Sequence, residues 1–232
     1  MGSRTSSGIG ARRVSRPRAG SLWRATRVGL LSTSDVDQAL ALYAAGFFPM
    51  DDPEEAFGPL PFYAAEDRAV IELDVATRAR LRRRVRRSLR AGAGWRLEVD
   101  TAFGAVVHAC ALPRDPGDGI WITPRLAALY GELHAAGHAH SFEIYAGDRL
   151  AAGMLAVLMG RAAMLESMNH WVPHAGNVLV ARTLDHLAAA GYHFADLQMA
   201  TEHTLRLGAR LIGREDYEQR LRAALVDDGR VN

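Results

Sequence analysis

The sequence predicts a mixed α/β fold of the α+β type, because strands joined by tight turns and strands joined by helices both occur in it. Residues 140–168 consist of apolar runs divided by Gly147-Asp148 and Gly160-Arg161, which is typical of three antiparallel strands. Residues 174–191 form a periodic apolar segment that ends at a glycine, and this pattern predicts a helix before the next strand. The 232 residues, 49% of them hydrophobic, suffice for a substantial core.

The first half of the chain is predicted to alternate helices and strands. Ser34 is a candidate N-cap for a helix that Gly46 ends. Residues 46–68 are rich in Pro, Gly and aromatics and are predicted to form a long ordered loop. Thr123-Pro124 supplies an N-cap and a first-turn proline for a helix that continues to about residue 136. The other elements predicted here are a strand at 69–74, a helix at 75–92, a strand at 95–100 and a helix capped by Asp100 that runs through Cys110.

The C-terminal part is predicted to contain a strand at 192–199, a short helix and strand at 201–213, and an amphipathic helix at 214–225. Asp196 and Gln198 lie two residues apart, so we expect them on one face of their strand. An ionised Asp can accept a proton or orient an attacking amine, and Gln can donate to a carbonyl oxygen. The alternative is that both are ordinary polar residues at a strand end.

Charge is distributed unevenly along the chain. Residues 1–30 contain seven Arg and no acid, whereas the rest of the chain has 21 Arg, no Lys, and 26 acidic residues. We expect residues 1–33 to be a disordered basic tail, which either attracts nucleic acid or precedes the true start of the protein. The predicted domains are a small N-terminal domain at 34–73 and a larger domain at 74–226, followed by a short tail at 227–232.

Several classes of site are excluded by composition and motifs. Cys110 is the only cysteine, so no disulfide can form within the chain, which fits a cytoplasmic protein. No apolar stretch has the roughly 18 residues of a membrane span, and we expect no membrane association. The patterns GxxxxGK[ST], GxSxG and GxGxxG are absent. We therefore expect a reaction that starts from an already activated donor and needs neither ATP nor a covalent intermediate.

A histidine-rich segment, HAAGHAH at 134–140, raises the question of a metal site, because Glu143 follows it. Gly137 is expected to end the preceding helix, which would leave these ligands without fixed geometry, and no cysteine lies nearby. We expect no metal, with the histidines placed at a helix end and a strand start.

The predicted helix at 75–92 carries eight arginines and no acid, while Leu81, Val85 and Leu89 form its apolar stripe. Uncompensated like charges destabilise a free helix, and a polyanion would relieve their repulsion. A solvated face is the alternative, although such faces normally mix both signs. The predicted phosphate contacts are Arg80, Arg82, Arg83, Arg84, Arg86, Arg87 and Arg90.

One carboxylate, Glu166, interrupts the apolar run AVLMGRAAMLESM at 156–168. Burying an ionised carboxylate is costly unless partners compensate for lost water. Glu166 either faces solvent at a strand end or meets a cation or amine of a substrate. Trp121, before the Thr123-Pro124 helix, is either a core residue or a platform on which a base stacks.

Taken together, the ordered motifs of residues 40–217 resemble the leucyl/phenylalanyl-tRNA–protein transferase family. The stretches that carry the resemblance are YAAGFFPM (43–50), FYAAEDRAVIELD (62–74), RRSLR (86–90), VDTAFGAVVHACA (99–111), GIWIT (119–123), LYGELHAAGHAHSFEIY (129–145), RLAAGMLAVLMGRAAMLESM (149–168), DLQMATEHTLRLGA (196–209) and REDY (214–217). The resemblance implies a small N-terminal domain followed by a GNAT-like acyltransferase domain with a mixed, largely antiparallel sheet. It implies transfer of Leu or Phe from aminoacyl-tRNA to the N-terminal Arg or Lys of a protein, in a monomeric enzyme without cofactor or metal.

The resemblance also implies roles for single residues. Asp196 would deprotonate or orient the attacking amine, and Gln198 would bridge Asp196 to the reacting centre. Glu166 would hold the amine or the aminoacyl end of the donor. The arginine-rich helix would contact the acceptor stem of the tRNA. The residues implied for substrate binding are Phe62, Tyr63, Trp121, Met154, Ala163, Ser167 and Met168.

This sequence departs from the family pattern near the implied site. Met50 replaces a tryptophan, Ala163 replaces a phenylalanine, and Asn169 replaces an aromatic residue after ESM. Gly176 and Asn177 stand where the family has Ser-Lys. These changes motivate an alternative in which aminoacyl-tRNA serves to form an amide on a different, small amine. A non-catalytic RNA-binding relative is a third hypothesis, which the retained acidic residues argue against.

Overall fold

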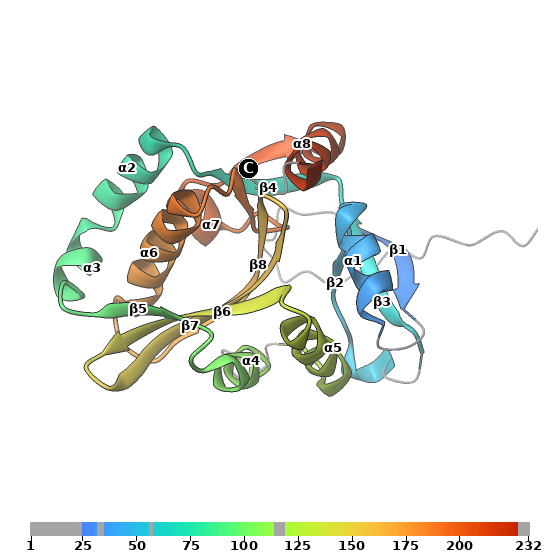
Figure 1. Ribbon diagram of the computed structural model, residues 1–232, viewed down its shortest axis with the longest axis horizontal. Coiled ribbons are helices and arrows are strands. Elements are labelled where there is room, and N and C mark those ends of the chain that lie inside the picture. Colours follow the sequence, from blue (N-terminus) through green and yellow to red (C-terminus); the bar gives the residue numbers. More distant parts are fainter. Residues whose placement is uncertain (1–24, 32–34, 56–57, 114–118, 227–232) are drawn as a thin grey trace, which may run out of the picture.

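The computed structural model describes residues 25–31, 35–55, 58–113 and 119–226, which form two β-sheets and the helices that cover them (Figure 1). The small sheet has the order β1 (Ala25–Leu31), β3 (Leu60–Ala65), β2 (Phe48–Pro49). The large sheet has the order β10 (Arg210–Gly213), β4 (Asp67–Glu72), β9 (Phe194–Asp196), β8 (Ala162–His170), β7 (Arg149–Met159), β6 (Ala139–Ala146), β5 (Arg96–Val99).

The large sheet is antiparallel except for one pair, β8 with β9, which is parallel. Strands β6, β7 and β8 form the predicted meander, and Gly147 and Gly160 occupy its turns with φ of 63° and 53°. A helix-bearing crossover connects β8 to β9. The predicted mixed α/β class with a largely antiparallel sheet is therefore confirmed.

Helices cover both faces of the large sheet (Figure 1). α6 (Ala175–Ala189) packs on one face against β6, β7 and β8, whereas α4 (Phe103–Cys110) and α5 (Pro124–Ala135) pack on the other. A Cβ at Gly153 of β7 would lie 2.5 Å from Cγ2 of Val106, so this glycine allows α4 to approach the sheet. The remaining helices are α1 (Val36–Ala44), the 3-10 helix η1 (Pro53–Glu55), α2 (Val75–Arg84), α3 (Arg86–Ala91), α7 (Glu202–Leu207) and α8 (Arg214–Val226).

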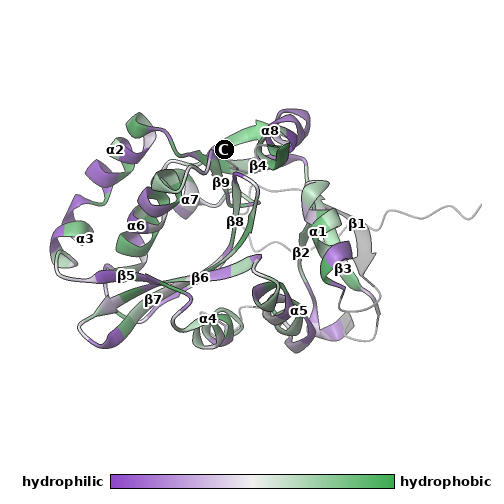
Figure 2. Cartoon of the chain, viewed as in Figure 1, coloured by the Kyte–Doolittle hydropathy of each residue, from purple (hydrophilic) through white to green (hydrophobic). Residues whose placement is uncertain are grey.

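Buried apolar side chains form two clusters, one on each face of the large sheet. Leu155 and Val157 of β7 face the cluster that includes residues of the small sheet, α1, α4, α5 and α8. Met154 and Ala156 face the cluster covered by α6 and α2. Because β7 is buried on both faces, its sequence is almost continuously apolar. Figure 2 shows this hydrophobic centre, with hydrophilic residues on the outer parts of α2 and α3.

Two predictions for the N-terminal region were wrong. Residues 46–68 contain β2, η1, β3 and the start of β4, and every residue of β3 is buried, so this segment is not a long loop. Residues 25–31 of the predicted disordered tail form β1, which pairs with β3. Residues 1–24 and 227–232 lie outside the described residues. Glu66 alone separates β3 from β4, so the division between the two sheets falls at this residue.

Helix boundaries also differ in places. The N-cap of α1 is Asp35, which accepts a hydrogen bond from the Gln38 nitrogen (3.1 Å), while Ser34 lies outside the described residues. The arginine-rich segment is two helices that meet at Val85. Asp100 does not cap α4, whose N-cap is Ala102. The predicted α5, α6, α7, β10 and α8 are confirmed within one to three residues. Among the described helices, none has the length and apolar character needed to span a membrane.

Candidate functional site

The predicted site lies where β8 and β9 stop pairing. Their parallel register joins residues 162–164 to residues 194–196 and ends there. Beyond it, Leu155 of β7 pairs with Ser167, whereas Ala156 pairs with Leu165. Glu166 is therefore the extra residue of a β-bulge. The bulge explains why Met168 packs on the α6 side of the sheet although Glu166, two residues earlier, faces the other side.

Asp196 is fully buried, and its carboxylate is occupied by donors from the protein. Arg68 Nε donates to its two oxygens (3.0 and 3.1 Å), and Arg68 Nη2 donates to Oδ2 (2.8 Å). The Tyr217 hydroxyl donates to Oδ2 (2.8 Å), and the Gln198 nitrogen donates to Oδ1 (2.8 Å). These contacts satisfy a buried charge, as its loss of water requires.

Arg68 connects three parts of the molecule at this carboxylate. It is 2% exposed, and its Nη1 donates to the Gly46 oxygen (2.9 Å) after α1. Its guanidinium carbon lies 4.7 Å from the Phe48 ring centre and 4.4 Å from that of Tyr217. The end of α1, the large sheet and α8 are thus fixed to one another through the Arg68–Asp196 pair.

Gln198 does not share a strand face with Asp196, so that prediction was wrong. β9 ends at Asp196, and Gln198 has a left-handed backbone with φ of 56°. Such a conformation costs a non-glycine residue about 1–3 kcal/mol, and the hydrogen bond to Asp196 Oδ1 holds it. With its amide nitrogen facing two carbonyls, Gln198 donates to the oxygens of Leu197 (3.1 Å) and Leu165 (3.2 Å). Its side chain therefore spans the separation of β8 and β9.

Glu166 lies on the same side of the sheet as Asp196 and is 8% exposed. The Tyr130 hydroxyl donates to its Oε2 (3.2 Å), and the Tyr43 hydroxyl lies close enough to the carboxylate to lower its pKa as well. Burial, reinforced by the negative charge of Asp196, raises the pKa of Glu166 to about 8. Glu166 is therefore mostly protonated at neutral pH in the free protein.

The Tyr43 hydroxyl has no hydrogen-bond partner among the described residues, although it is buried. It lies near enough to Glu166 and Tyr130 for both to raise its pKa, which burial raises most. Phe62 meets the Tyr43 ring edge-on, with 5.9 Å between ring centres. A buried hydroxyl without a partner is costly and uncommon in folded proteins, so it indicates a position for a ligand.

The aromatic residues implied for substrate binding lie on this side of the sheet. Phe62 and Tyr63 are buried in β3, and the half-buried Trp121 packs against the same apolar cluster. Asp51 fixes the Trp121 segment, because its nitrogen donates to the Trp121 oxygen (3.2 Å) and its carboxylate binds Arg125 (2.5 Å).

The residues implied for the donor side chain lie mainly on the opposite face. Met154 pairs with Met168 across β7 and β8, and both belong to the region under α6, as does Ala163. Ser167 is buried in β8. The two groups of predicted residues are thus on different faces of one sheet, next to the point where β8 and β9 part.

The residues that depart from the family pattern are well integrated here. Asn169 Nδ2 donates to the Ala109 oxygen (2.9 Å) and links β8 to α4. Asn177 Nδ2 donates to Ser88 Oγ (3.1 Å) and links α6 to α3. A Cβ at Gly176 would lie 3.1 Å from Met168 Cε, so a serine there would push Met168 aside.

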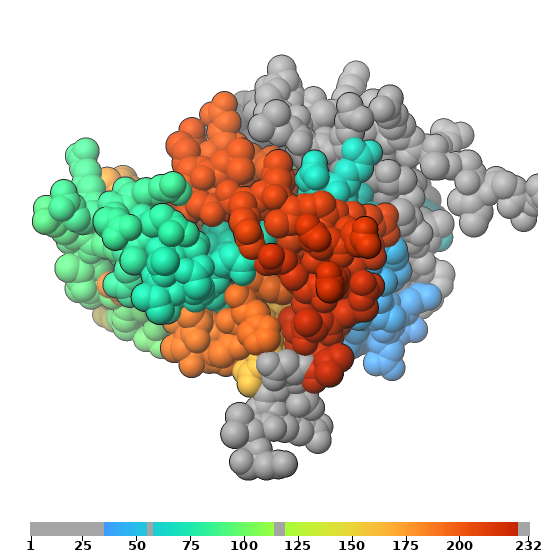
Figure 3. Space-filling view, turned by 90° about the horizontal axis from the view of Figure 1, so that it is seen from above, coloured from blue at the N-terminus to red at the C-terminus, as the bar shows by residue number. Residues whose placement is uncertain are grey.

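The seven predicted phosphate-contacting arginines are all exposed on α2 and α3. Figure 3 shows these helices as a green to teal lobe at one end of the molecule. The helices contain no acid, but Asp185 of α6 binds Arg78 (2.9 Å) and Arg82. Among the described residues no salt bridge to an acid is found for the other six: Arg80, Arg83, Arg84, Arg86, Arg87 and Arg90. Arg80 nevertheless lies near enough to Asp74 to contribute to the lowered pKa of that carboxyl.

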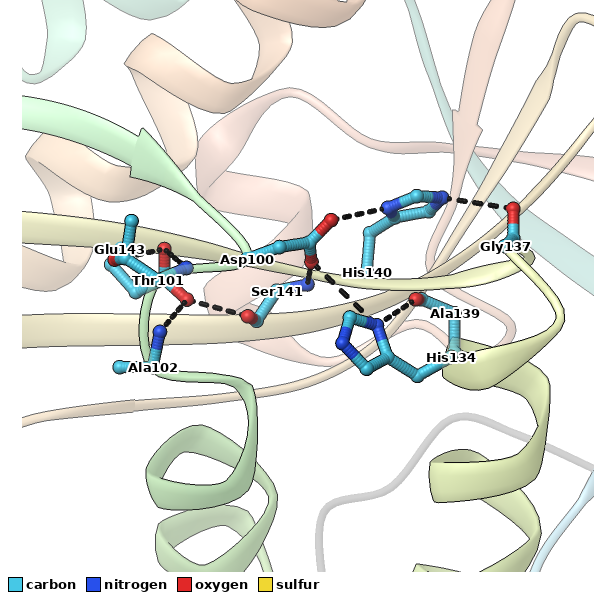
Figure 4. Close-up of polar contacts among 9 residues, drawn as sticks. All are labelled: Asp100, Thr101, Ala102, His134, Gly137, Ala139, His140, Ser141 and Glu143. Carbon is cyan, nitrogen blue, oxygen red and sulfur yellow. Dashed lines mark hydrogen bonds and ion pairs between the residues drawn. The ribbon is translucent and has the colours of Figure 1, made fainter.

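The histidine-rich segment forms no metal cluster within the part of the chain that the structure describes. His140 Nδ1 lies 2.7 Å from Asp100 Oδ2, and His134 Nδ1 lies 2.8 Å from the Ala139 oxygen (Figure 4). Glu143 is buried beside them and accepts hydrogen bonds at the start of α4, so these residues organise a helix–strand junction.

Sequence reasoning missed four residues of the site: Arg68, Tyr43, Tyr130 and Tyr217. Arg68 directly precedes the apolar triplet 69–71, and a charged residue next to a buried strand signals a buried ion pair. The three tyrosines follow helical apolar periodicity, which does not distinguish a core ring from a functional hydroxyl.

Comparison with known proteins places these features in a family context. Residues 71–222 match the profile of the family described as leucyl/phenylalanyl-tRNA protein transferase. A leucyl/phenylalanyl-tRNA–protein transferase of Cereibacter sphaeroides is 41% identical over 191 residues, which cover 80% of this chain and 83% of the relative. One from Anaeromyxobacter sp. is 39% identical over 201 residues, covering 85% of this chain and 83% of the relative.

A likeness to a solved structure supports the fold. The crystal structure of FemX matches with a TM-score of 0.51 and 11% identity, covering 88% of this chain and 86% of that chain. The mixed α/β architecture is therefore shared with a solved protein of very different sequence.

Proposed function

Because this chain belongs to the leucyl/phenylalanyl-tRNA–protein transferase family, we propose that it transfers Leu or Phe from aminoacyl-tRNA to the N-terminal Arg or Lys of an acceptor protein. The ester of the charged tRNA is the activated donor, so the peptide bond forms without ATP. We place the reaction in the cytoplasm, where charged tRNA is found, and we expect the enzyme to act as a monomer.

The observation that carries this proposal is the buried acidic site at the separation of β8 and β9. Glu166 and Asp196 bring two carboxylates and one compensating guanidinium, Arg68, to the same side of the sheet. An amine nucleophile suits this surplus of acid, because a positive or hydrogen-bond-donating group is favoured beside carboxylates. Asp196 is already bound by Arg68, so its proposed role is to hold the backbone of Gln198, which then contacts the reacting ester.

The proposed donor site uses the two faces of the sheet. The aminoacyl side chain would contact Met154, Met168 and Ala163, because thioether side chains adapt to Leu, Phe and Met. The small Ala163 and Gly176 favour a roomier pocket. The terminal adenosine would stack near Trp121, with Phe62 and Tyr63 behind it.

The exposed arginines of α2 and α3 are the proposed tRNA contacts. They carry no base-reading pattern, so they would position the acceptor stem through its phosphates and not select its sequence. Changing Arg83, Arg86 and Arg87 together to Gln should weaken tRNA binding and lower its salt slope by about 2–3. Arg78, which binds Asp185 at 2.9 Å, is the matched control: Arg78→Gln should leave the slope nearly unchanged. An unaltered slope in the triple variant would contradict this interface.

The activity is tested by mixing the protein with radiolabelled Phe-tRNA or Leu-tRNA and a peptide that begins with Arg. Label in the peptide supports the proposal, and the same peptide with an acetylated N-terminus should stay unlabelled. Label found only in a small amine, such as free arginine, would support the alternative acceptor. Binding of tRNA without any transfer would contradict both.

A further inference from the structure

We propose that Glu166 is the general base of this transfer, and that it takes a proton from the attacking ammonium in a cation site completed by the Tyr43 and Tyr130 hydroxyls. The inference rests on the proposed function, which it deepens by naming the group that activates the nucleophile. It replaces Asp196, the residue that the sequence suggested for deprotonation.

The first argument is that the carboxylates of Asp196 and Glu166 differ in how many hydrogen bonds they already accept from the protein. Asp196 receives donors from Arg68, Tyr217 and Gln198, all at 3.1 Å or less. Glu166 receives one hydrogen bond from the described residues, from Tyr130 at 3.2 Å. A proton acceptor must present an oxygen to the substrate, and Glu166 is the carboxylate of the pair that does so.

The second argument is the unused hydroxyl of Tyr43. It is 1% exposed, and its oxygen has no partner among the described residues. An ammonium between Glu166 and Tyr43 would donate to both oxygens, which turns a costly buried hydroxyl into a ligand. Tyr43 comes from α1, Tyr130 from α5 and Glu166 from β8, so three elements converge on this position.

The third argument is the bulge at Glu166. The extra residue points the carboxylate toward α1 and α5 while Met168 remains on the α6 side. A nucleophile held by Glu166 and a donor side chain held by Met168 would therefore approach each other at the strand separation that Gln198 spans.

Charge around Glu166 matches this task. The ionisable groups that face it are Tyr43 of α1, Arg68 of β4, Tyr130 of α5, Asp196 of β9 and Tyr217 of α8, with Cys110 of α4 beside Tyr130. Burial and Asp196 raise the pKa of Glu166 to about 8. The α-amino group of a peptide has a pKa of about 7.7–8.0, so the proton transfer between them is nearly balanced.

The proton and bond changes balance as follows. The Glu166 carboxylate removes one proton from the bound ammonium, and the nitrogen lone pair attacks the ester carbon. The new C–N bond forms, the C–O bond to the ribose breaks, and a second amine proton goes to the leaving ribose oxygen. Glu166 then releases its proton to solvent, so the products are an amide, uncharged ribose hydroxyl and one proton.

The test is the pH dependence of kcat/KM between pH 6 and 10 with Phe-tRNA and an Arg-starting peptide, with spontaneous deacylation measured separately. The wild type requires ionised Glu166 and a protonated amine, so its profile should be bell-shaped with a maximum near pH 8. Glu166→Gln should lower the maximum by about 100-fold or more and give a profile that rises to a plateau. Wild-type transfer with an unchanged bell in Glu166→Gln would overturn the inference, while no wild-type transfer would overturn the proposed function.

Two variants separate catalysis from folding. Tyr130→Phe keeps Glu166 but removes one of the two tyrosine hydroxyls that lower its pKa, so the maximum should move to higher pH. Glu143→Gln is the matched control, because Glu143 is another buried glutamate of the same sheet. Its profile should keep the wild-type bell. A maximum that stays in place in Tyr130→Phe, or the loss of the bell in Glu143→Gln, would contradict a specific role for Glu166.

Discussion

The sheet contains two buried glutamates, Glu143 and Glu166, whose surroundings differ sharply. Glu143 Oε1 accepts from the Ala102 nitrogen (3.2 Å) and the Ser141 hydroxyl, and Oε2 accepts from the nitrogen (3.5 Å) and hydroxyl (3.2 Å) of Thr101 (Figure 4). Glu166 receives one hydrogen bond from the described residues. Burial raises the pKa of both groups.

The difference shows that burial alone does not mark a functional carboxylate, and that the hydrogen bonds it already accepts must be considered as well. Thr101 and Ala102, which donate to Glu143, directly precede α4, so the carboxylate fixes the segment that leads from β5 into this helix. Asp196 belongs with Glu143, since its oxygens are likewise occupied. Glu166 is buried at comparable depth but keeps an oxygen for a ligand, which is the condition for a group that works on a substrate.

The largest expected effect concerns the Arg68–Asp196 pair. Arg68→Met leaves the Asp196 charge buried without compensation and should lower the free energy of unfolding by about 3–5 kcal/mol. Replacing both residues, Arg68→Met with Asp196→Leu, should recover much of that loss but not transfer, because Gln198 loses its anchor. Urea unfolding measures the first effect. If the free energy of unfolding of Arg68→Met lay within about 1 kcal/mol of the wild-type value, Arg68 would not be needed to compensate the Asp196 charge.

The next effect is the pH dependence of stability. The pKa of Glu166 is about 8 in the folded protein and 4.5 as the reference value, so the wild type loses stability as pH rises between these values. Glu166→Gln cannot ionise and should therefore be more stable than the wild type at pH 9, with the gap shrinking at pH 5. Urea midpoints at the two pH values measure this difference, and an equal gap at both would argue against a raised pKa.

Glu143→Gln sharpens the comparison from the other side. The amide removes an acceptor from backbone donors at the start of α4, which should cost about 1–3 kcal/mol. Transfer by the folded fraction should remain at the wild-type rate, because Glu143 holds the segment before α4 and does not meet the substrate. Thermal unfolding measures the loss of stability, and the transfer assay measures the rate of the folded fraction. Loss of transfer at full folding would place Glu143 in the site.

The smallest effect on stability is expected for Tyr43→Phe. The hydroxyl is buried and makes no hydrogen bond with the described residues, so its removal should leave the free energy of unfolding unchanged or raise it by up to about 1 kcal/mol. Tyr130→Phe removes the bond to Glu166 and should cost about 1 kcal/mol. Tyr43→Phe should nevertheless raise KM for the peptide. Unchanged KM, or a large loss of stability, would show that the Tyr43 hydroxyl has another partner.

The sequence predicted the fold well where local signals decide it. Thr123 caps α5 as expected and accepts from the Leu126 nitrogen, and the glycines at 147 and 160 form the meander turns. Long-range pairing decided the failures. β3 and β1 pair with each other although neither sequence alternates in hydrophobicity. Asp100 does not cap α4 because its carboxylate accepts a hydrogen bond from the Ser141 nitrogen (2.8 Å).

The site was predictable in its carboxylates but not in their division of roles. Glu166 stood out as one acid in an apolar run, and Asp196 through its neighbour Gln198. That Arg68 occupies Asp196 depends on β4 lying beside β9, a contact between residues 128 positions apart. The bulge that places Met168 and Glu166 on opposite faces is likewise a property of register, which a single strand sequence does not specify.

The most direct measurement is the titration of the Glu166 carboxyl itself by NMR, in protein labelled with carbon-13 at the glutamate carboxyl carbons. The signal that disappears in Glu166→Gln identifies the group. A titration midpoint near pH 8 is expected, together with a shift when a peptide beginning with Arg is added. A midpoint near 4.5, unaffected by the peptide, would show that Glu166 is an ordinary carboxylate and would remove it as the proton acceptor.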